Sequence, residues 1–136
     1  MTTIKFGKKN LKIKFTYKAT FKTGILRKFA KFATTQEKGE TMDILDQTMG
    51  IVPEMILAGV QKYHSDEYGY DYDTGEGREE ALSKIYDLLD DYFDDDAADF
   101  NALMDALQKE LLEDGFLAKM LRKELKAAEK ESKKTA

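Results

Sequence analysis

Residues 11–29 read LKIKFTYKATFKTGILRKF, and the spacing of the apolar residues changes partway through this stretch. Leu11, Ile13 and Phe15 alternate with lysines and a threonine, which is the period of a strand with one buried face. From Tyr17 onward the apolar residues recur every three or four positions, which predicts one face of a helix. The residues expected on this face are Tyr17, Phe21, Ile25, Phe29 and Phe32.

The segment just before this stretch predicts a partner strand. Ile4 and Phe6 flank Lys5, and a short connection, GKKN at residues 7–10, contains glycine and asparagine. We therefore predict an antiparallel hairpin over about residues 3–16. A two-stranded hairpin alone is marginally stable in water, so its apolar face must pack against the rest of the chain.

Gly24 interrupts the expected helical face. A glycine inside a helix costs about 1 kcal/mol relative to alanine, so a break at this residue is one alternative. A strand that continues through Ala19 to Phe21 is a second alternative, although a helix is preferred.

The remaining chain is predicted to be mostly helical. Residues 34–40 are polar and predict a loop, after which Thr41 is suited to cap a short helix through Met49. Pro53 would lie in the first turn of the next helix. The expected helical stripes are Ile56, Leu57, Val60 and Tyr63; Leu82, Ile85, Tyr86, Leu89 and Phe93; Phe100, Leu103, Met104, Leu107 and Leu111; and Leu117, Leu121 and Leu125.

Loops are expected between the later helices. Residues 65–78, SDEYGYDYDTGEGR, lack a helical stripe, and a loop of this length is either functional or mobile. Asp94, Asp95 and Asp96 should end one helix, and one of them or Asp99 should cap the next.

These elements predict a mainly α, α+β fold. We expect a single helical domain over residues 1–131, with the N-terminal antiparallel β-hairpin, and a disordered polar tail at 132–136. The 136-residue chain has no run near the roughly 18 consecutive apolar residues of a membrane span. The first residues lack the long apolar stretch of a secretory signal.

The net charge of −4 conceals a strong segregation of charge along the chain. Residues 1–40 carry +9, residues 41–117 carry −17 and residues 118–136 carry +4. Exposed charges are screened beyond about 8 Å at physiological salt, so attraction between these segments requires close contact. We expect the basic head to pair with the acidic middle, either within one molecule or by self-association.

Few residues in the sequence suggest catalysis or metal binding. The chain has no cysteine and one histidine, His64, which is expected at a surface or helix end. A GxSxG nucleophile motif is absent. Asp71, Asp73 and Gly75 resemble an EF-hand loop only in part, because residues 75, 76 and 82 do not fit, so at most a weak calcium contact remains open. We expect no enzyme and no cofactor.

Two charged regions allow further hypotheses. The seven aspartates of residues 87–99 predict a solvated helix face, with Leu88, Leu89, Tyr92 and Phe93 turned inward; they could also form an acidic DNA mimic that inhibits a nuclease or restriction system. The hairpin lysines could bind nucleic acid. However, Phe6, Phe15 and Tyr17 fall on the opposite, buried parity from Lys12 and Lys14, which argues against a stacking platform.

The chain begins with a small hairpin and then enters a helix through an aromatic-x-aromatic-Lys-Ala pattern, formed here by Phe15, Tyr17, Lys18 and Ala19. In this order of elements it resembles the tail assembly chaperones of long-tailed (siphovirus-type) phages and prophages. A middle helix at 53–64 and an acidic, leucine-rich helix at 79–93 agree with that family in order and length. The likeness covers about residues 3–125. The tyrosine-rich loop at 68–72 and the long C-terminal helical region depart from the family pattern.

The resemblance implies a non-enzymatic protein of the host bacterial cytoplasm that is absent from the mature virion. Such chaperones bind the tape measure protein, keep it soluble and help to recruit tail tube subunits. A partner helix docks through residues at helical spacing, and flexible methionines suit adaptable surfaces. The candidate partner-binding residues are Met49, Met55, Met104, Met120, Leu117, Leu121 and Leu125.

Overall fold

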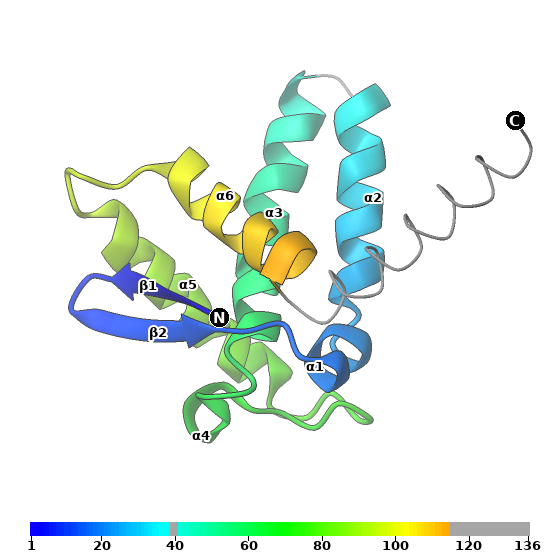
Figure 1. The fold of residues 1–136 in the computed structure, drawn as a ribbon, viewed down its shortest axis with the longest axis vertical. Helices are drawn as coiled ribbons and strands as arrows, with labels where there is room; N and C mark the ends of the chain where they lie inside the picture. Colours follow the sequence, from blue (N-terminus) through cyan, green and yellow to red (C-terminus); the bar gives the residue numbers. More distant parts are fainter. Residues whose placement is uncertain (39–40, 115–136) are drawn as a thin grey trace, which may run out of the picture.

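The computed structural model describes residues 1–38 and 41–114 of the chain. A two-stranded antiparallel sheet lies at the N-terminus, and helices make up most of the rest (Figure 1). The expected mainly α, α+β fold class is therefore confirmed. No helix in the described ranges is long and apolar enough to cross a membrane.

The hairpin pairs β1 (Thr2–Phe6) with β2 (Lys9–Ile13), and Ile4 lies opposite Leu11. The alternate residues Ile4, Phe6, Leu11 and Ile13 are buried, while Lys5 and Lys12 are exposed. The apolar face rests on the helical part of the molecule, where β1 contacts α5 and β2 contacts α3. Both predictions for the hairpin are confirmed: one face of each strand is buried, and that face packs against the rest of the chain.

The first helical segment is broken in two. α1 (Tyr17–Lys22) begins after Thr16, whose Oγ1 accepts a hydrogen bond from the Ala19 N–H at 3.2 Å, and α2 (Ile25–Lys38) follows. Gly24 between them has φ +75°, a conformation that glycine adopts readily. The alternative with a break at Gly24 is therefore confirmed.

This break changes which residues of the expected face are buried. Ile25 and Phe32 lie in the core, whereas Tyr17 and Phe21 are exposed. The prediction of one continuous buried face was wrong, because the turn at Gly24 separates the direction of α1 from that of α2. The expected loop at 34–40 was also wrong in part: α2 continues to Lys38, through residue types with good helix propensity such as Gln36 and Glu37.

α3 (Thr41–Gly59) is one helix with Pro53 inside it, not two helices that meet there. An interior proline removes a backbone hydrogen bond and costs about 3 kcal/mol. On either side of Pro53, however, Val52 and Met55 are buried. Burial of an apolar side chain contributes about 1.5–3 kcal/mol, so packing offsets the cost of the proline.

The remaining elements are α4 (Ser65–Tyr68), α5 (Arg78–Phe93), α6 (Phe100–Lys109) and a short π-helix, η1 (Glu110–Asp114). Asp99 caps α6 by accepting a hydrogen bond from the Ala102 N–H at 3.2 Å, as expected. α5 starts and ends where the sequence predicts. On the predicted stripes, however, Tyr63, Tyr86 and Phe93 are substantially exposed.

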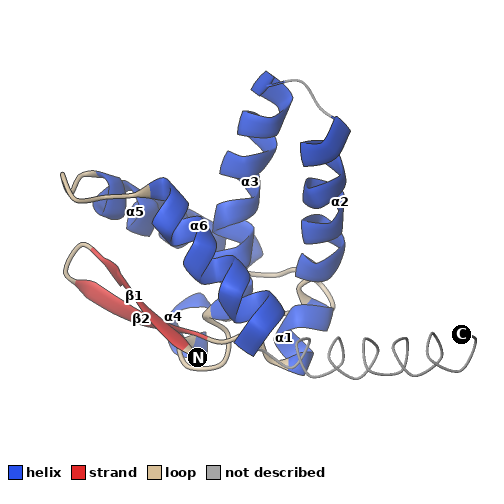
Figure 2. Ribbon diagram, turned by 45° about the horizontal axis from the view of Figure 1, so that its top comes forward, coloured by secondary structure: helices blue, strands red, loops and turns tan. Residues whose placement is uncertain are grey.

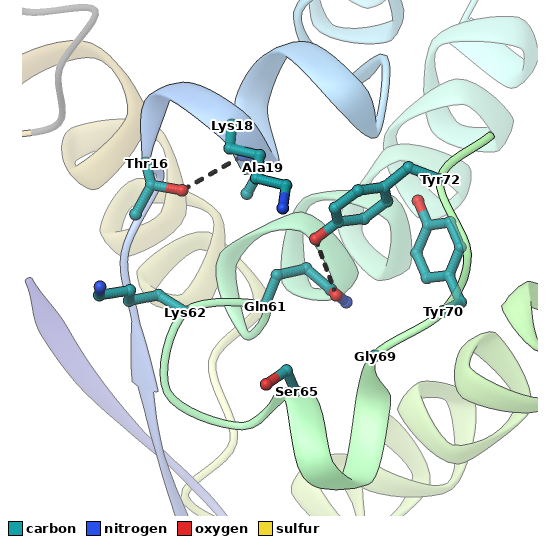
Figure 3. A pocket seen from close by; sticks show the side chains of 9 residues that line it. All are labelled: Thr16, Lys18, Ala19, Gln61, Lys62, Ser65, Gly69, Tyr70 and Tyr72. Atoms are coloured by element: carbon teal, nitrogen blue, oxygen red, sulfur yellow. Dashed lines mark hydrogen bonds between the residues drawn. The ribbon is translucent and has the colours of Figure 1, made fainter.

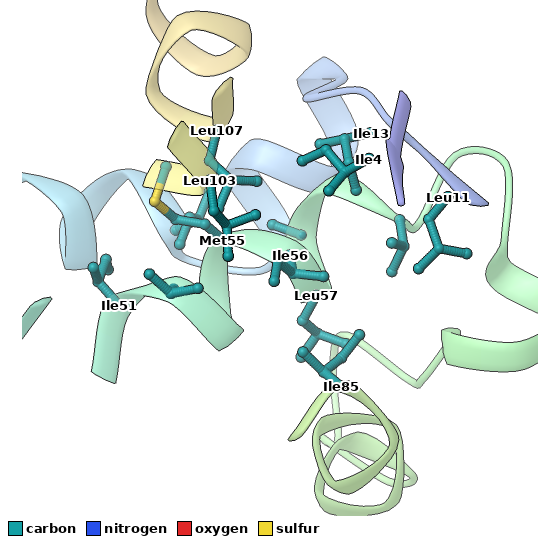
Figure 4. Packing of buried hydrophobic residues seen from close by; sticks show 14 of the residues in the cluster. Ile4, Leu11, Ile13, Ile51, Met55, Ile56, Leu57, Ile85, Leu103 and Leu107 are labelled. Carbon is teal, nitrogen blue, oxygen red and sulfur yellow. The ribbon is translucent and has the colours of Figure 1, made fainter. Parts of the chain in front are cut away.

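α3 is the central helix of the core. Figure 4 shows Leu103 and Leu107 of α6 on one side of Met55 and Ile56, and Ile85 of α5 on another side. α2 runs beside the N-terminal half of α3, and these two helices extend beyond the rest of the domain (Figures 1 and 2). The first half of α3 is thus covered by fewer elements than its second half.

Candidate functional site

An apolar stripe runs along the N-terminal half of α3. Met42, Leu45 and Met49 are 72%, 53% and 53% exposed, and their spacing places them on one helix face. The same spacing of three and four residues continues with Val52 and Ile56, which are buried. This face of α3, which we call the α3 seam, is therefore covered by the rest of the domain in the second half of the helix and open in the first half. We call Met42, Leu45 and Met49 the α3 stripe.

A hollow of about 360 Å³ lies beside the α3 stripe, between α2 and α3. Lys28 and Lys31 of α2 line it, together with Asp46 and Gly50 of α3. A Cβ atom built on Gly50 would meet nothing within 4 Å, so this part of the α3 surface is open. The stripe and the hollow together form a helical surface that another helix can contact.

The predicted partner-binding residues divide into three groups. Met49 lies on the exposed α3 stripe. Met55 and Met104 are core residues, 0% and 7% exposed, so a partner cannot reach them in this conformation. The four other candidates, Leu117, Met120, Leu121 and Leu125, lie outside the described residues.

Met42 and Leu45 were missed by the sequence analysis. Their signal is the spacing 42, 45, 49, 52 and 56, which forms one seam only if a single helix continues through Pro53. Because the predicted helices were divided at that proline, the seam was divided as well.

A charged cluster stabilises the side of α3 that faces α2 and α5. Glu54 Oε2 accepts a hydrogen bond from Lys28 Nζ at 2.9 Å and another from Arg78. Partial burial alone would raise the pKa of Glu54, but these two cationic donors outweigh burial and lower it. Glu54 thus stays ionised and connects three helices.

The tyrosine-rich loop after α4 is anchored by Gln61. Its Nε2 donates to the carbonyls of Leu57 and Tyr68, at 3.0 and 2.8 Å, and its Oε1 accepts from the Tyr72 hydroxyl at 3.0 Å. Burial raises the pKa of Tyr70 and Tyr72. The sequence analysis missed Gln61, since its role depends on contacts that are distant in the chain.

A hollow of about 460 Å³ opens next to this anchor, lined by α1, the segment that follows α3, the start of α4 and the loop (Figure 3). Tyr72 reaches across it to Gln61, while Lys62 points away (Figure 3). The lining is an open mixture of polar and aromatic side chains without a paired acid and base. The contacts of Gln61 in this lining have a structural role, because they hold the loop in place.

The histidine and the acidic loop have structural roles. His64 Nε2 accepts a hydrogen bond from the Lys12 backbone N–H at 3.0 Å and so ties β2 to the segment after α3. Asp71 Oδ1 accepts from the backbone N–H groups of Asp73 and Thr74 at 2.8 and 3.1 Å, and these bonds lower its pKa. Within residues 1–38 and 41–114, no three His, Asp or Glu side chains are placed to hold a metal ion.

Ion pairs connect the basic head to the acidic middle of the same molecule. Lys9 pairs with Glu67, and Lys28 pairs with Glu54. The bond to Lys9 lowers the pKa of Glu67. Part of the expected attraction between the basic head and the acidic middle therefore takes the form of ion pairs within one molecule.

The surface of α1 differs from its prediction. Phe6 and Phe15 are buried as expected, but Tyr17 is 66% exposed and its ring is parallel to that of Phe21, with centroids 6.3 Å apart. Lys18 and Lys22 are exposed on the same short helix. The parity argument against an exposed platform of aromatic and basic residues therefore fails for Tyr17.

The aspartate-rich helix is a solvated face, as its simplest interpretation predicts. On α5, Asp87, Asp90 and Asp91 are exposed, while Leu88 is buried. Leu89 and Tyr92 are partly buried against the core, but Phe93 is 42% exposed and was wrongly placed inward.

No protein-family model matches this chain, and no curated protein or solved structure shows significant similarity to it. The candidate binding surface is therefore inferred from the structure of this chain itself. Among the described residues, the α3 stripe places three exposed apolar side chains on one helix face beside the open hollow at Gly50.

Proposed function

We propose that this protein is a phage tail assembly chaperone that binds the tape measure protein, keeps it soluble and helps to recruit tail tube subunits during tail assembly. The α3 stripe is the observation that supports this proposal. Exposed apolar side chains that gather on one helix face, as Met42, Leu45 and Met49 do, are typical of a surface that another protein covers. The protein acts by binding, in the host cytoplasm, without an enzymatic step, and leaves before the virion is complete.

The size of the stripe suits temporary binding. Complete burial of one such side chain contributes about 1.5–3 kcal/mol, and association itself costs several kcal/mol. Three side chains therefore give a weak contact at each site, which tail tube subunits can displace. Met42 and Met49 are flexible and can adapt to successive segments of a long helical partner.

Co-expression with the tape measure protein tests the proposal. The partner is the very long helical protein that we expect the downstream reading frame to encode. It is expressed as overlapping tagged segments. The wild-type chain should keep segments with amphipathic helices in the soluble fraction and should co-purify with them. Leu45→Lys and Met49→Lys should each reduce that recovery severalfold, because a buried charge opposes docking.

Leu112→Lys is the matched control, since Leu112 is an exposed leucine of η1, outside the α3 stripe. It should leave recovery unchanged. If the wild-type chain captures no tape measure segment, the proposed function is wrong. If all three variants capture segments equally well, the α3 stripe is not the binding surface.

An acidic DNA mimic is the second candidate. The exposed aspartates along α5 and after it favour this function, because they present a row of carboxylates. A mimic should compete with duplex DNA for a nuclease or restriction enzyme, and Asp90→Asn with Asp91→Asn should weaken the competition. A chaperone should not affect these enzymes at any concentration.

A further inference from the structure

The outer face of the hairpin carries lysines that the fold does not neutralise. Lys5 of β1 and Lys12 of β2 are exposed, and Lys14, just after β2, is partly exposed. Among the described residues, none of these three lysines forms an ion pair. By contrast, Lys9 of the same hairpin pairs with Glu67. The outer face therefore presents positive charge that remains available to another molecule.

An aromatic ring lies beside these lysines. Tyr63, in the segment after α3, is 42% exposed, and Lys12 Nζ lies 5.5 Å from the centre of its ring. The next residue, His64, accepts a hydrogen bond from the Lys12 backbone N–H and so fixes this segment against β2. Phe6 and Phe15 of the hairpin region point into the core. The exposed ring that the hairpin itself lacks is thus supplied by a different part of the chain.

The positive surface continues into the hollow of about 460 Å³ at the end of the hairpin. Thr16, three residues after β2, and Lys62, the residue before Tyr63, both line it. Lys18 extends from α1 toward Tyr72, whereas Lys62 points away from the hollow (Figure 3). None of the described residues that line the hollow is acidic. We call the following residues the hairpin face: Lys5, Lys12, Lys14, Lys62 and Tyr63.

We propose that the hairpin face binds single-stranded nucleic acid. The lysine ammonium groups contact phosphates of the strand, and the exposed ring of Tyr63 stacks on a base. Proteins that bind single strands combine these two features, a positively charged surface that follows the backbone and aromatic rings on which bases stack. The bases of a duplex are already stacked on one another, so the ring of Tyr63 selects a single strand.

The overall charge of the chain does not account for this binding. The net charge is −4, which opposes a general attraction to phosphates. Exposed charges are screened beyond about 8 Å at physiological salt, so the close contacts of the hairpin face decide the interaction. Glu67, which contacts the hairpin, is paired with Lys9. An acidic protein would satisfy the lysines, but carboxylates have no flat surface to stack on Tyr63.

Fluorescence anisotropy of the full-length protein with labelled oligothymidine tests the contribution of the lysines. The wild type should bind at low salt, and a plot of log association constant against log salt concentration should have a slope of about −2 to −3, as about three or four phosphate contacts require. Lys12→Gln with Lys62→Gln should weaken binding and make this slope shallower by about 1.4. Arg27→Gln with Lys31→Gln, at exposed sites on α2, removes the same charge and should change neither quantity.

Substitution of Tyr63 separates stacking from charge. Tyr63→Leu should weaken oligothymidine binding at least about fivefold, because one stacked base is lost. Tyr63→Phe keeps an aromatic ring and should bind as the wild type does. Tyr86→Leu, at an exposed tyrosine of α5, is the matched control and should have no effect. Circular dichroism should confirm that all variants fold.

Four results would overturn the inference: no binding of oligothymidine at low salt, equally tight binding of a duplex, unchanged binding by Tyr63→Leu, and equally tight binding of polyglutamate. The last result would assign the hairpin face to an acidic protein. Oligouridine is measured in parallel, and tighter binding of one of the two oligonucleotides distinguishes RNA from DNA as the single strand bound.

The hairpin face is separate from the α3 stripe used in the proposed function. Lys12→Gln with Lys62→Gln should therefore capture tape measure segments as well as the wild type does. Conversely, Leu45→Lys should bind oligothymidine at least as well as the wild type. A failure of nucleic-acid binding is thus distinct from a failure of the proposed function.

Discussion

Arg78, the first residue of α5, donates a hydrogen bond to Glu54 in the second half of α3. Lys28 of α2 donates to the same oxygen. One carboxylate of α3 therefore connects this helix to α2 and to the start of α5, where the long loop ends. Two separate positive charges on one acceptor make Glu54 the residue whose ionisation matters most to this part of the fold.

Glu54→Gln should lower stability at neutral pH by about 1.5–3 kcal/mol, the usual contribution of charge-assisted hydrogen bonds. The pKa of Glu54 is lowered in the folded protein, so its contribution is complete above the ordinary pKa and is lost as the pH falls through the folded value. The difference between wild type and variant, measured by urea denaturation, should therefore shrink at acid pH. Glu76→Gln, at an exposed loop residue, is the control. A constant difference from neutral to acid pH would show that the ionisation of Glu54 does not stabilise the fold.

Gly59→Ala and Gly50→Ala should have opposite effects on stability. A Cβ on Gly59 would lie 2.5 Å from Cγ2 of the buried Ile13, at the point where the Lys14 N–H donates to the Gly59 carbonyl at 2.9 Å. Alanine there should push the hairpin away and cost about 1–3 kcal/mol, as overpacking does.

At Gly50 the new methyl group meets open space, and alanine should stabilise α3 by up to about 1 kcal/mol. Thermal denaturation of the two variants provides the comparison, each serving as control for the other. Equal melting temperatures would show that the close contact between β2 and the end of α3 is not maintained in solution.

Gln61→Leu should loosen the tyrosine-rich loop. The substitution leaves the carbonyl of Tyr68 and the hydroxyl of Tyr72 without this partner, and an unsatisfied buried polar group costs about 1–3 kcal/mol. Amide hydrogen exchange of residues 69–77 should accelerate more than that of α5. Gln47→Leu, at an exposed residue of α3, should change neither the stability nor the hydrogen exchange of the loop. Unchanged exchange in the loop of the Gln61 variant would argue that other contacts hold it.

Local patterns were enough to predict much of the fold. Alternation from Leu11 to Phe15 identified β2, and the spacing of Leu103, Met104 and Leu107 identified the buried face of α6. These signals depend on neighbours within a few residues, and the structure preserves them. Asp99 as a cap is a signal of the same local kind.

The errors arose where distant contacts outweigh local preference. Pro53 indicates a helix start in the sequence, yet burial around it keeps α3 continuous. The turn at Gly24 was foreseen as an alternative, but its consequence, the exposure of Tyr17 and Phe21, requires the three-dimensional arrangement. Of the candidate site, only Met49 was identified in advance, because the rest of the stripe depends on the uninterrupted helix.

The two halves of the α3 seam should respond differently to the same kind of change. Ile56 is 0% exposed, and Ile56→Ala should cost about 2–5 kcal/mol through lost burial and the cavity left behind. Leu45→Ala lies on the open half, and surface changes of this type usually stay within about 0.5 kcal/mol. Urea denaturation of both variants at a low protein concentration measures the contrast. A cost above about 1 kcal/mol for Leu45→Ala would mean that the isolated chain already covers the stripe, and the surface proposed for the tape measure protein would then not be free to bind.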